Sequence, residues 1–346
     1  MAEVSKEQIE AKLKEYIDPY VEKDLVSAKL VKDISIDGGK VTLAITLGFP
    51  AKGYVDTLSS KLTELLGSVD GVSEVVVNIT TKIAAHKAQK GVEPIEGIKN
   101  IIAIASGKGG VGKSTTSVNL ALALAAEGAS VGILDADIYG PSQPRMLGVT
   151  GRPESEDGKT LQPITSYDIQ AMSIGFLVDE ETPMIWRGPM VTQALNQLLN
   201  DTKWTELDYL IIDLPPGTGD IQLTLAQRVP VSGAVIVTTP QDIALLDARK
   251  AMDMFKKTGT PVLGVIENMS THICSECGHE EHIFGHGGAK AEADKQGFPF
   301  LGEVPLHIDI RTASDGGAPI VVSDPESKPA TAFRDIARKL IADGIV

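Results

Sequence analysis

The sequence predicts an α/β fold in which a mostly parallel sheet is covered by helices on both faces, preceded by a small α/β domain. From residue 101 onward, short apolar runs alternate with helical segments, a pattern typical of parallel strands that are buried on both faces. Before them, residues 1–82 hold shorter runs of alternating polar and apolar residues. With 346 residues, the chain is long enough for two such domains.

Composition narrows the classes of function. The formal net charge of −14 argues against a primary role in binding nucleic-acid phosphates or a stable association with anionic membrane. No stretch approaches the roughly 20 apolar residues that span a bilayer, and the acidic N-terminus lacks a signal-peptide core. Only two cysteines occur, which is typical of a reducing compartment. We therefore expect a cytoplasmic protein.

The small domain, residues 1–82, is expected to begin with a helix and to contain a hairpin. The dipeptide Gly38-Gly39 after Asp37 predicts the hairpin turn. The expected elements are a helix over 6–16, strands over 31–36 and 41–45, an amphipathic helix over 55–66 and a strand over 72–79. Residues 83–97 are polar and without apolar period, which predicts a linker to a second domain over 98–346.

The second domain is expected to alternate strands and helices. Its predicted strands are 101–105, 131–134, 169–174, 209–212, 234–238 and 262–266, and its predicted helices are 112–127, 190–200 and 243–257. Residues 330–341 have periodic apolar residues and three cations. A membrane-surface helix is one interpretation of them, but an ordinary helix packed on the sheet is the favoured one.

A glycine-rich motif after the first strand of this domain predicts a phosphate-binding loop. Residues 107–115, GKGGVGKST, match the pattern G-x-x-x-x-G-K-[ST] between an apolar run and a helix. Lys113 is expected to reach the β- and γ-phosphates of ATP, and Ser114 to hold Mg²⁺. The expected nucleotide-binding residues of the motif are Gly107, Lys108, Gly109, Gly110, Val111, Gly112, Lys113, Ser114 and Thr115.

A second lysine distinguishes this loop from the general pattern. Lys108 directly follows the first glycine, a position on the outer lip from which it could reach a nucleotide bound by a partner subunit. Here the sequence resembles the deviant-Walker group of P-loop ATPases, which includes MinD, ParA, the nitrogenase iron protein and the Mrp/ApbC cluster carriers. The resemblance implies a P-loop NTPase fold and a nucleotide-sandwich homodimer.

Two carboxylates follow the strand over 131–134. The two-residue spacing of Asp135 and Asp137 points both to one side of the chain at the edge of the sheet where ligands bind. Two acidic residues that merely end a strand are the plainer interpretation. The resemblance implies that Asp137 orients the attacking water, in a catalytic set with Lys108 and Lys113, and that Asp135 supports the Mg²⁺ shell.

Further nucleotide-binding residues follow later strands. Asp213 comes directly after apolar residues and is assigned as the Walker-B carboxylate opposite Ser114. The string DLPPGTGD over 213–220 resembles the Mrp/ApbC branch, and its loop is expected to respond to the γ-phosphate. By the same resemblance, Asn268 reads the adenine, although a lone asparagine at a strand end is most often a turn residue.

Cys274 and Cys277 form a C-x-x-C motif among clustered histidines. Four of the six histidines lie within residues 272–286. This pattern fits a structural zinc site, a redox disulfide, or half of an iron–sulfur site, which needs four thiolates and therefore two chains. The order of motifs over residues 98–340 resembles the Mrp/ApbC carriers. That resemblance implies a slow, switch-type ATP hydrolase that carries a bridging 4Fe-4S cluster in a homodimer and delivers it to apoproteins.

The small domain also resembles the cluster-assembly domain that often precedes Mrp-type ATPases. Those domains often have a cysteine just after the second strand, whereas residues 48–51 of this chain, GFPA, have none. We therefore expect residues 1–82 to dock partners, such as clients or a cluster scaffold or source, rather than to bind a cluster. The alternative function for the whole chain is a MinD/ParA-like positioning or partition ATPase with a structural zinc site.

Overall fold

A computed structural model describes residues 4–86, 93–177, 188–274 and 276–342. Part of the expected linker, residues 87–92, and position 275 of the C-x-x-C motif lie outside them. The chain divides into two compact units, one chiefly of residues up to Ala84 and the other chiefly of Ala85–Leu340. Among the described residues, no helix is both long and apolar enough to cross a membrane.

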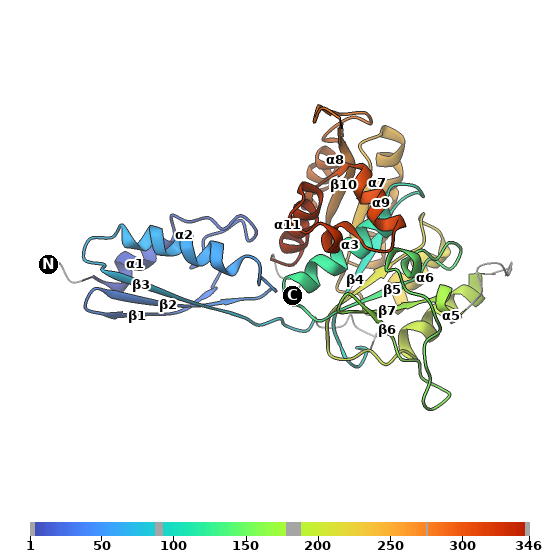
Figure 1. The fold of residues 1–346 in the computed structure, drawn as a ribbon, viewed down its shortest axis with the longest axis horizontal. Helices are drawn as coiled ribbons and strands as arrows, with labels where there is room; N and C mark the ends of the chain where they lie inside the picture. The colour runs from blue at the N-terminus through green and yellow to red at the C-terminus, as the bar shows by residue number, and fades with distance from the viewer. Residues whose placement is uncertain (1–3, 87–92, 178–187, 275, 343–346) are drawn as a thin grey trace. The chain divides into compact units, whose positions relative to one another are not determined.

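The smaller unit is a three-stranded sheet with two helices on one side (Figure 1). In chain order it contains α1 (Lys6–Leu13), β1 (Val31–Asp37), β2 (Lys40–Leu47), α2 (Val55–Gly67) and β3 (Glu74–Thr81). The β1–β2 pair is antiparallel and closes at Gly38, whose φ is 59°, as the hairpin signal predicted. Strand β3 pairs with β2 in parallel. Leu58, Leu62 and Leu66 recur every four residues and form the buried face of α2.

The larger unit contains a nine-stranded sheet in the order β11-β10-β9-β4-β8-β5-β7-β6, with β12 beside β10. All of its pairs are parallel except those of the two short outer strands, β6 and β11. The strands are β4 (Ile98–Ala105), β5 (Val131–Asp135), β6 (Ile164–Ser166), β7 (Ile169–Ser173), β8 (Leu207–Asp213), β9 (Gly233–Thr238), β10 (Val262–Ile273), β11 (Glu280–Glu281) and β12 (Phe300–Leu306). The predicted fold class is confirmed.

Helices cover this sheet in two layers (Figure 1). Helices α5 (Gly188–Asn200), α6 (Asp220–Arg228), α7 (Asp242–Thr258) and α8 (Gly288–Gln296) contact one another in a row, and α7 and α8 pack on β9 and β10. The remaining helices are α3 (Lys113–Ala126), α4 (Gln143–Met146), α9 (Ile308–Asp315), α10 (Ile320–Ser323) and α11 (Lys328–Ala342). The central strands β4, β5, β8 and β9 are almost wholly buried, as their apolar sequences predicted.

Strand β10 differs from the sequence-based expectation in length. It continues to Ile273, seven residues past its predicted end, because polar residues after Ile266 still pair with β12 and with β11. Asn268 therefore lies within a strand rather than in a turn at its end. The strand also leads directly to Cys274.

Candidate functional site

The glycine-rich loop lies between β4 and α3, at the carboxyl edge of the parallel sheet. Gly110 and Gly112 have φ values of 83° and 81°, which favour glycine. A side chain on Gly112 would collide with the amide of Asn268, and one on Gly107 would collide with the backbone of Asp247. The first and last glycines of the motif are thus required by close packing. Because α3 begins at Lys113, its positive N-terminal end faces the loop.

A buried ion pair joins the loop to the predicted Walker-B residue. The Lys113 ammonium lies 2.6 Å from Oδ1 of Asp213, with the two side chains only 6% and 0% exposed. The Ser117 hydroxyl donates to the same oxygen at 2.9 Å. The Gln143 amide donates to Oδ2 of Asp213 at 2.9 Å and to the backbone oxygen of Ser114 at 3.1 Å. Both carboxylate oxygens of Asp213 are therefore engaged next to the start of α3.

Asp135 lies beside Asp213, since the two are register partners on β5 and β8. Its carboxylate is fully buried and accepts hydrogen bonds from the backbone N–H groups of Asp137, Ser142 and Gln143, at 2.9 to 3.1 Å. Burial and the negative charge of Asp213 raise the pKa of Asp135 to about 7. Asp135 thus shapes the chain that follows β5 as well as adding charge to the site.

Asp137 faces an open cavity next to the phosphate loop. The cavity has a volume of about 480 Å³, and Pro216 in its wall lies 4.0 Å from the position that a side chain on Gly109 would take. Its lining is Asp137, Tyr139, Gly140, Pro215, Pro216, Gly219 and Gln222. Burial raises the pKa of Asp137. A carboxylate with a raised pKa beside a cavity that admits water is suited to hold a water molecule and to accept its proton.

Lys108 belongs to the loop, and Asn268 contacts the loop from β10. The backbone oxygen of Lys108 accepts a hydrogen bond from the Ser106 hydroxyl at 2.9 Å, and the lysine itself is partly exposed. The Asn268 amide donates to the backbone oxygen of Val111 at 2.8 Å. Asn268 therefore fastens β10 to the phosphate loop, a contact that its predicted adenine role did not include.

The cysteines follow the C-terminal end of β10. The backbone N–H of Cys274 donates to the carbonyl of His279, and the N–H of Gly278 donates to the carbonyl of Cys274, both at 2.9 Å. Both thiols are unpaired; Cys277 is exposed and Cys274 is half-buried. Backbone N–H groups of Cys277 and Glu276 that point at the Cys274 sulfur lower its pKa. The turn thus presents two thiols, and the lowered pKa of Cys274 favours its thiolate form.

Three of the four histidines near this motif, namely His272, His282 and His286, have side-chain contacts away from the thiols. Nδ1 of His272 lies 3.3 Å from Glu281, and Nδ1 of His282 lies 3.0 Å from the backbone oxygen of Ser270. His282 stacks on His286 with ring centroids 4.2 Å apart. Among the described residues, no group of three close metal-ligating side chains contains a cysteine.

Sequence reasoning missed two polar residues of the nucleotide site. Gln143 connects Asp213 to Ser114, and Ser117 supports Asp213 from one turn into α3. Ser117 lies four residues after Lys113, on the same helical face, which was a usable signal. No comparable spacing marked Gln143, because its position depends on how the chain folds back after β5.

Together the loop, the Lys113–Asp213 pair and the parallel sheet define a P-loop NTPase. Comparison with known proteins supports this class. A nucleotide-binding protein from Archaeoglobus fulgidus, solved in complex with ADP and with cobalt, is 40% identical, with a TM-score of 0.60 over 69% of this chain and 93% of that one. The cell-division ATPase MinD of Pyrococcus furiosus shares the fold, with 24% identity and a TM-score of 0.53 over 70% of this chain and 98% of that one.

Within that class, the chain belongs to the family of NUBPL iron-transfer P-loop NTPases, whose model matches residues 97–341. Residues 6–78 match the model of an iron-sulfur cluster assembly protein. The iron-sulfur cluster carrier protein of Escherichia coli is 50% identical over 94% of this chain and 88% of its own. The iron-sulfur cluster transfer protein NUBPL of Mus musculus is 50% identical over 80% and 86%, respectively. The family resemblance seen in the motifs is confirmed.

Proposed function

We propose that the protein is an ATP-dependent carrier that holds a 4Fe-4S cluster between two subunits and delivers it to apoproteins. The observation that carries this proposal is the course of β10. The strand fastens to the phosphate loop through Asn268 and ends next to Cys274, six residues later. At roughly 3.3 Å per residue, up to about 20 Å of strand separates the two sites.

The nucleotide site supplies slow hydrolysis that acts as a switch. With ATP and Mg²⁺ bound, Lys113 would exchange its bond with Asp213 for contacts to the β- and γ-phosphates, and Ser114 and Asp213 would hold the metal ion. Asp137 orients the water that attacks the γ-phosphorus and accepts its proton; the bond to the β–γ bridging oxygen breaks, ADP leaves with that oxygen, and phosphate is the second product. Lys108 of the partner subunit stabilises the charge that develops on the phosphates.

The cargo site is built from two chains. Four thiolates are needed for a 4Fe-4S cluster, and each chain offers Cys274 and Cys277 alone. The described histidines do not gather around these thiols, which argues against a zinc site completed by one chain. A cluster shared across an exposed turn is readily released, a property that suits a donor.

Anaerobic reconstitution with iron and sulfide tests the proposal. We expect one cluster per two chains by absorbance and by iron and sulfide analysis, and transfer of that cluster to an acceptor apoprotein. Cys277→Ser should lose the cluster and keep ATP binding, and Ser73→Ala, far from the motif in sequence, is the matched control. Zinc at one ion per chain, without cluster transfer, would contradict the proposal.

The smaller unit is proposed to dock clients or a cluster source. Its match to the cluster assembly family supports this role, and so does the absence of any cysteine in residues 1–82. Deletion of this unit should therefore reduce the rate of transfer to a client while leaving the cluster content per chain unchanged.

A further inference from the structure

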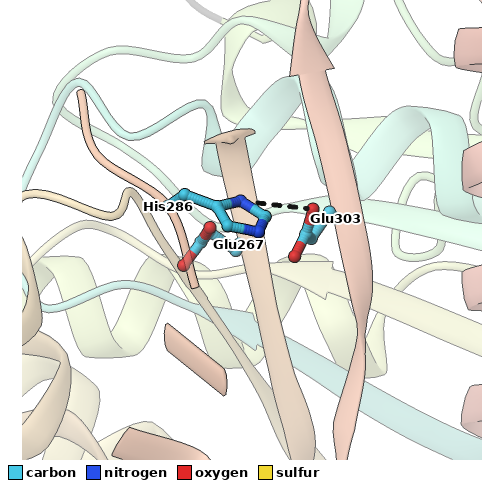
Figure 2. A group of neighbouring side chains, drawn as sticks. All are labelled: Glu267, His286 and Glu303. Carbon is cyan, nitrogen blue, oxygen red and sulfur yellow. Dashed lines mark ion pairs between the residues drawn. The ribbon is translucent and has the colours of Figure 1, made fainter. Parts of the chain in front are cut away.

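Three potential metal ligands converge at a place that neither the nucleotide site nor the cysteine motif uses. Glu267 comes from β10, Glu303 from β12, and His286 from the segment before α8 (Figure 2). Their ligand atoms all lie within 4.8 Å of one another, and Nδ1 of His286 is 3.9 Å from Oε2 of Glu303.

The pairing of β10 with β12 places the two carboxylates opposite each other. Glu267 and Glu303 are direct register partners in the parallel β10–β12 pair. Like charges placed opposite each other on paired strands destabilise a sheet. Among the ion pairs of the described residues, Glu303 has only His286 as a partner, and His286 is charged only when protonated. A bound cation would remove this repulsion.

Glu267 is held firmly by the start of α8. Its side chain is fully buried, and its two oxygens accept hydrogen bonds from the backbone N–H groups of Gly287 at 3.0 Å and Ala289 at 2.7 Å. This contact explains why a carboxylate is buried there. It does not explain why Glu303 and His286 also turn toward it, as Figure 2 shows. Each oxygen of Glu267 retains a lone pair for a further ligand.

We propose that Glu267, His286 and Glu303 form a mononuclear site for a first-row divalent cation of the Fe²⁺ or Zn²⁺ type. Two carboxylate oxygens and one imidazole nitrogen suit such ions, whereas Mg²⁺ prefers an all-oxygen shell. Metal bonds of about 2.0–2.2 Å place tetrahedral ligand atoms roughly 3.3–3.6 Å apart. The side chains of His286 and Glu303 are 51% and 33% exposed and can rotate inward toward the fixed Glu267.

A neighbouring ring orients the histidine. His282 stacks on His286 with an interplanar angle of 28°, and its own Nδ1 lies 3.0 Å from the backbone oxygen of Ser270 on β10. Outer contacts of this kind fix the orientation of a metal-ligating ring. The site therefore includes a residue of β10, the strand that leads to the cysteines, but shares no ligand with them.

Cobalt(II) titration of a chain without its thiols tests the site. In the Cys274→Ser/Cys277→Ser background, with excess Mg²⁺ to occupy the nucleotide carboxylates, visible absorbance and calorimetry should report one Co²⁺ per chain. Glu303→Gln and His286→Gln should each weaken binding at least about tenfold, the lower end of the loss seen when outer partners of a metal site are removed. Both positions are partly exposed, so folding should persist, and circular dichroism and thermal melting check it.

Two control variants separate this site from its surroundings. His279→Gln removes a histidine of the cysteine turn, and Glu326→Gln removes a carboxylate whose side chain is 88% exposed. Neither should change Co²⁺ affinity. The proposal is overturned if the double cysteine variant binds no Co²⁺, if Glu303→Gln and His286→Gln bind as tightly as their background, or if His279→Gln is the variant that loses binding. The titration contains no sulfide or thiolate, so its result is independent of cluster carriage.

Discussion

At the scale of single residues, the Lys113–Asp213 pair combines structural and chemical roles. Lys113→Ala leaves a fully buried carboxylate without its cation, which destabilises a protein by about 3–5 kcal/mol. The same change removes the group that contacts the β- and γ-phosphates. We expect no ATP hydrolysis and a lower free energy of unfolding, measured by phosphate release and by chemical denaturation.

The control for that variant is Lys250→Ala. The side chain of Lys250 is 68% exposed and pairs with Asp247 on the surface of α7, where an ion pair contributes little. Its loss should leave both hydrolysis and stability close to those of the unchanged chain. Equal destabilisation by the two substitutions would contradict the view that burial determines the effect at Lys113.

Asp135 gives the stability a specific pH dependence. Its pKa is about 7 in the folded chain, against an ordinary 3.8. Because the unfolded chain ionises first, the stability associated with this group is full below about pH 4 and is lost as pH rises toward 7. Between about pH 5.5 and 7.5, the difference in unfolding free energy between the chain and its Asp135→Asn variant should change by about 2 kcal/mol. Parallel stability curves for the two proteins would show that Asp135 does not titrate there.

At the scale of elements, the contact between β10 and the phosphate loop is open to a double-mutant test. Gly112→Ala introduces a methyl group that collides with the Asn268 amide at a φ of 81°. Gly110→Ala meets open space at a similar φ of 83°, so only the backbone strain of about 1–2 kcal/mol applies. We expect Gly112→Ala to weaken nucleotide binding more than Gly110→Ala does.

The rescue variant identifies the cause of that difference. In an Asn268→Ala background the collision is absent, so adding Gly112→Ala should cost no more than Gly110→Ala costs in the same background. Nucleotide affinity is measured by calorimetry for all six proteins: the unchanged chain, the three single variants and the two double variants. If Gly112→Ala remains as harmful without the Asn268 amide, the loop is not positioned by β10.

Elements with a strong period or composition were predictable from sequence, and elements defined by their neighbours were not. The buried strands β4, β8 and β9 and the helices α3 and α7 lie close to their predicted ranges, because continuous apolar runs and helical spacing are local signals. Strand β12 contains Gly302 and Pro305, which weaken its pattern. Its existence depends on pairing with β10.

The same division applies to the candidate site. The phosphate loop and Asp213 follow from local motifs, and the structure brings them together. The packing of Asn268 against Val111 joins residues 157 positions apart, and the group of Glu267, His286 and Glu303 depends on strand register. Neither relation can be predicted from a short window of sequence, because each depends on contacts between residues far apart in the chain.

At the scale of the whole molecule, the proposed homodimer predicts that two inactive variants restore each other. Lys108→Ala retains its own phosphate contacts but offers no lysine to its partner, whereas Lys113→Ala cannot use ATP but still offers Lys108. In a mixed dimer, the nucleotide site of the Lys108→Ala subunit combines its own Lys113 with the Lys108 that the Lys113→Ala subunit supplies. Random exchange makes about half of the dimers mixed, each with one working site, so the mixture should hydrolyse ATP at about a quarter of the unchanged rate. The test is phosphate release measured for each variant alone and for the mixture. A mixture that hydrolyses ATP no faster than its components would mean that Lys108 acts on the nucleotide of its own chain.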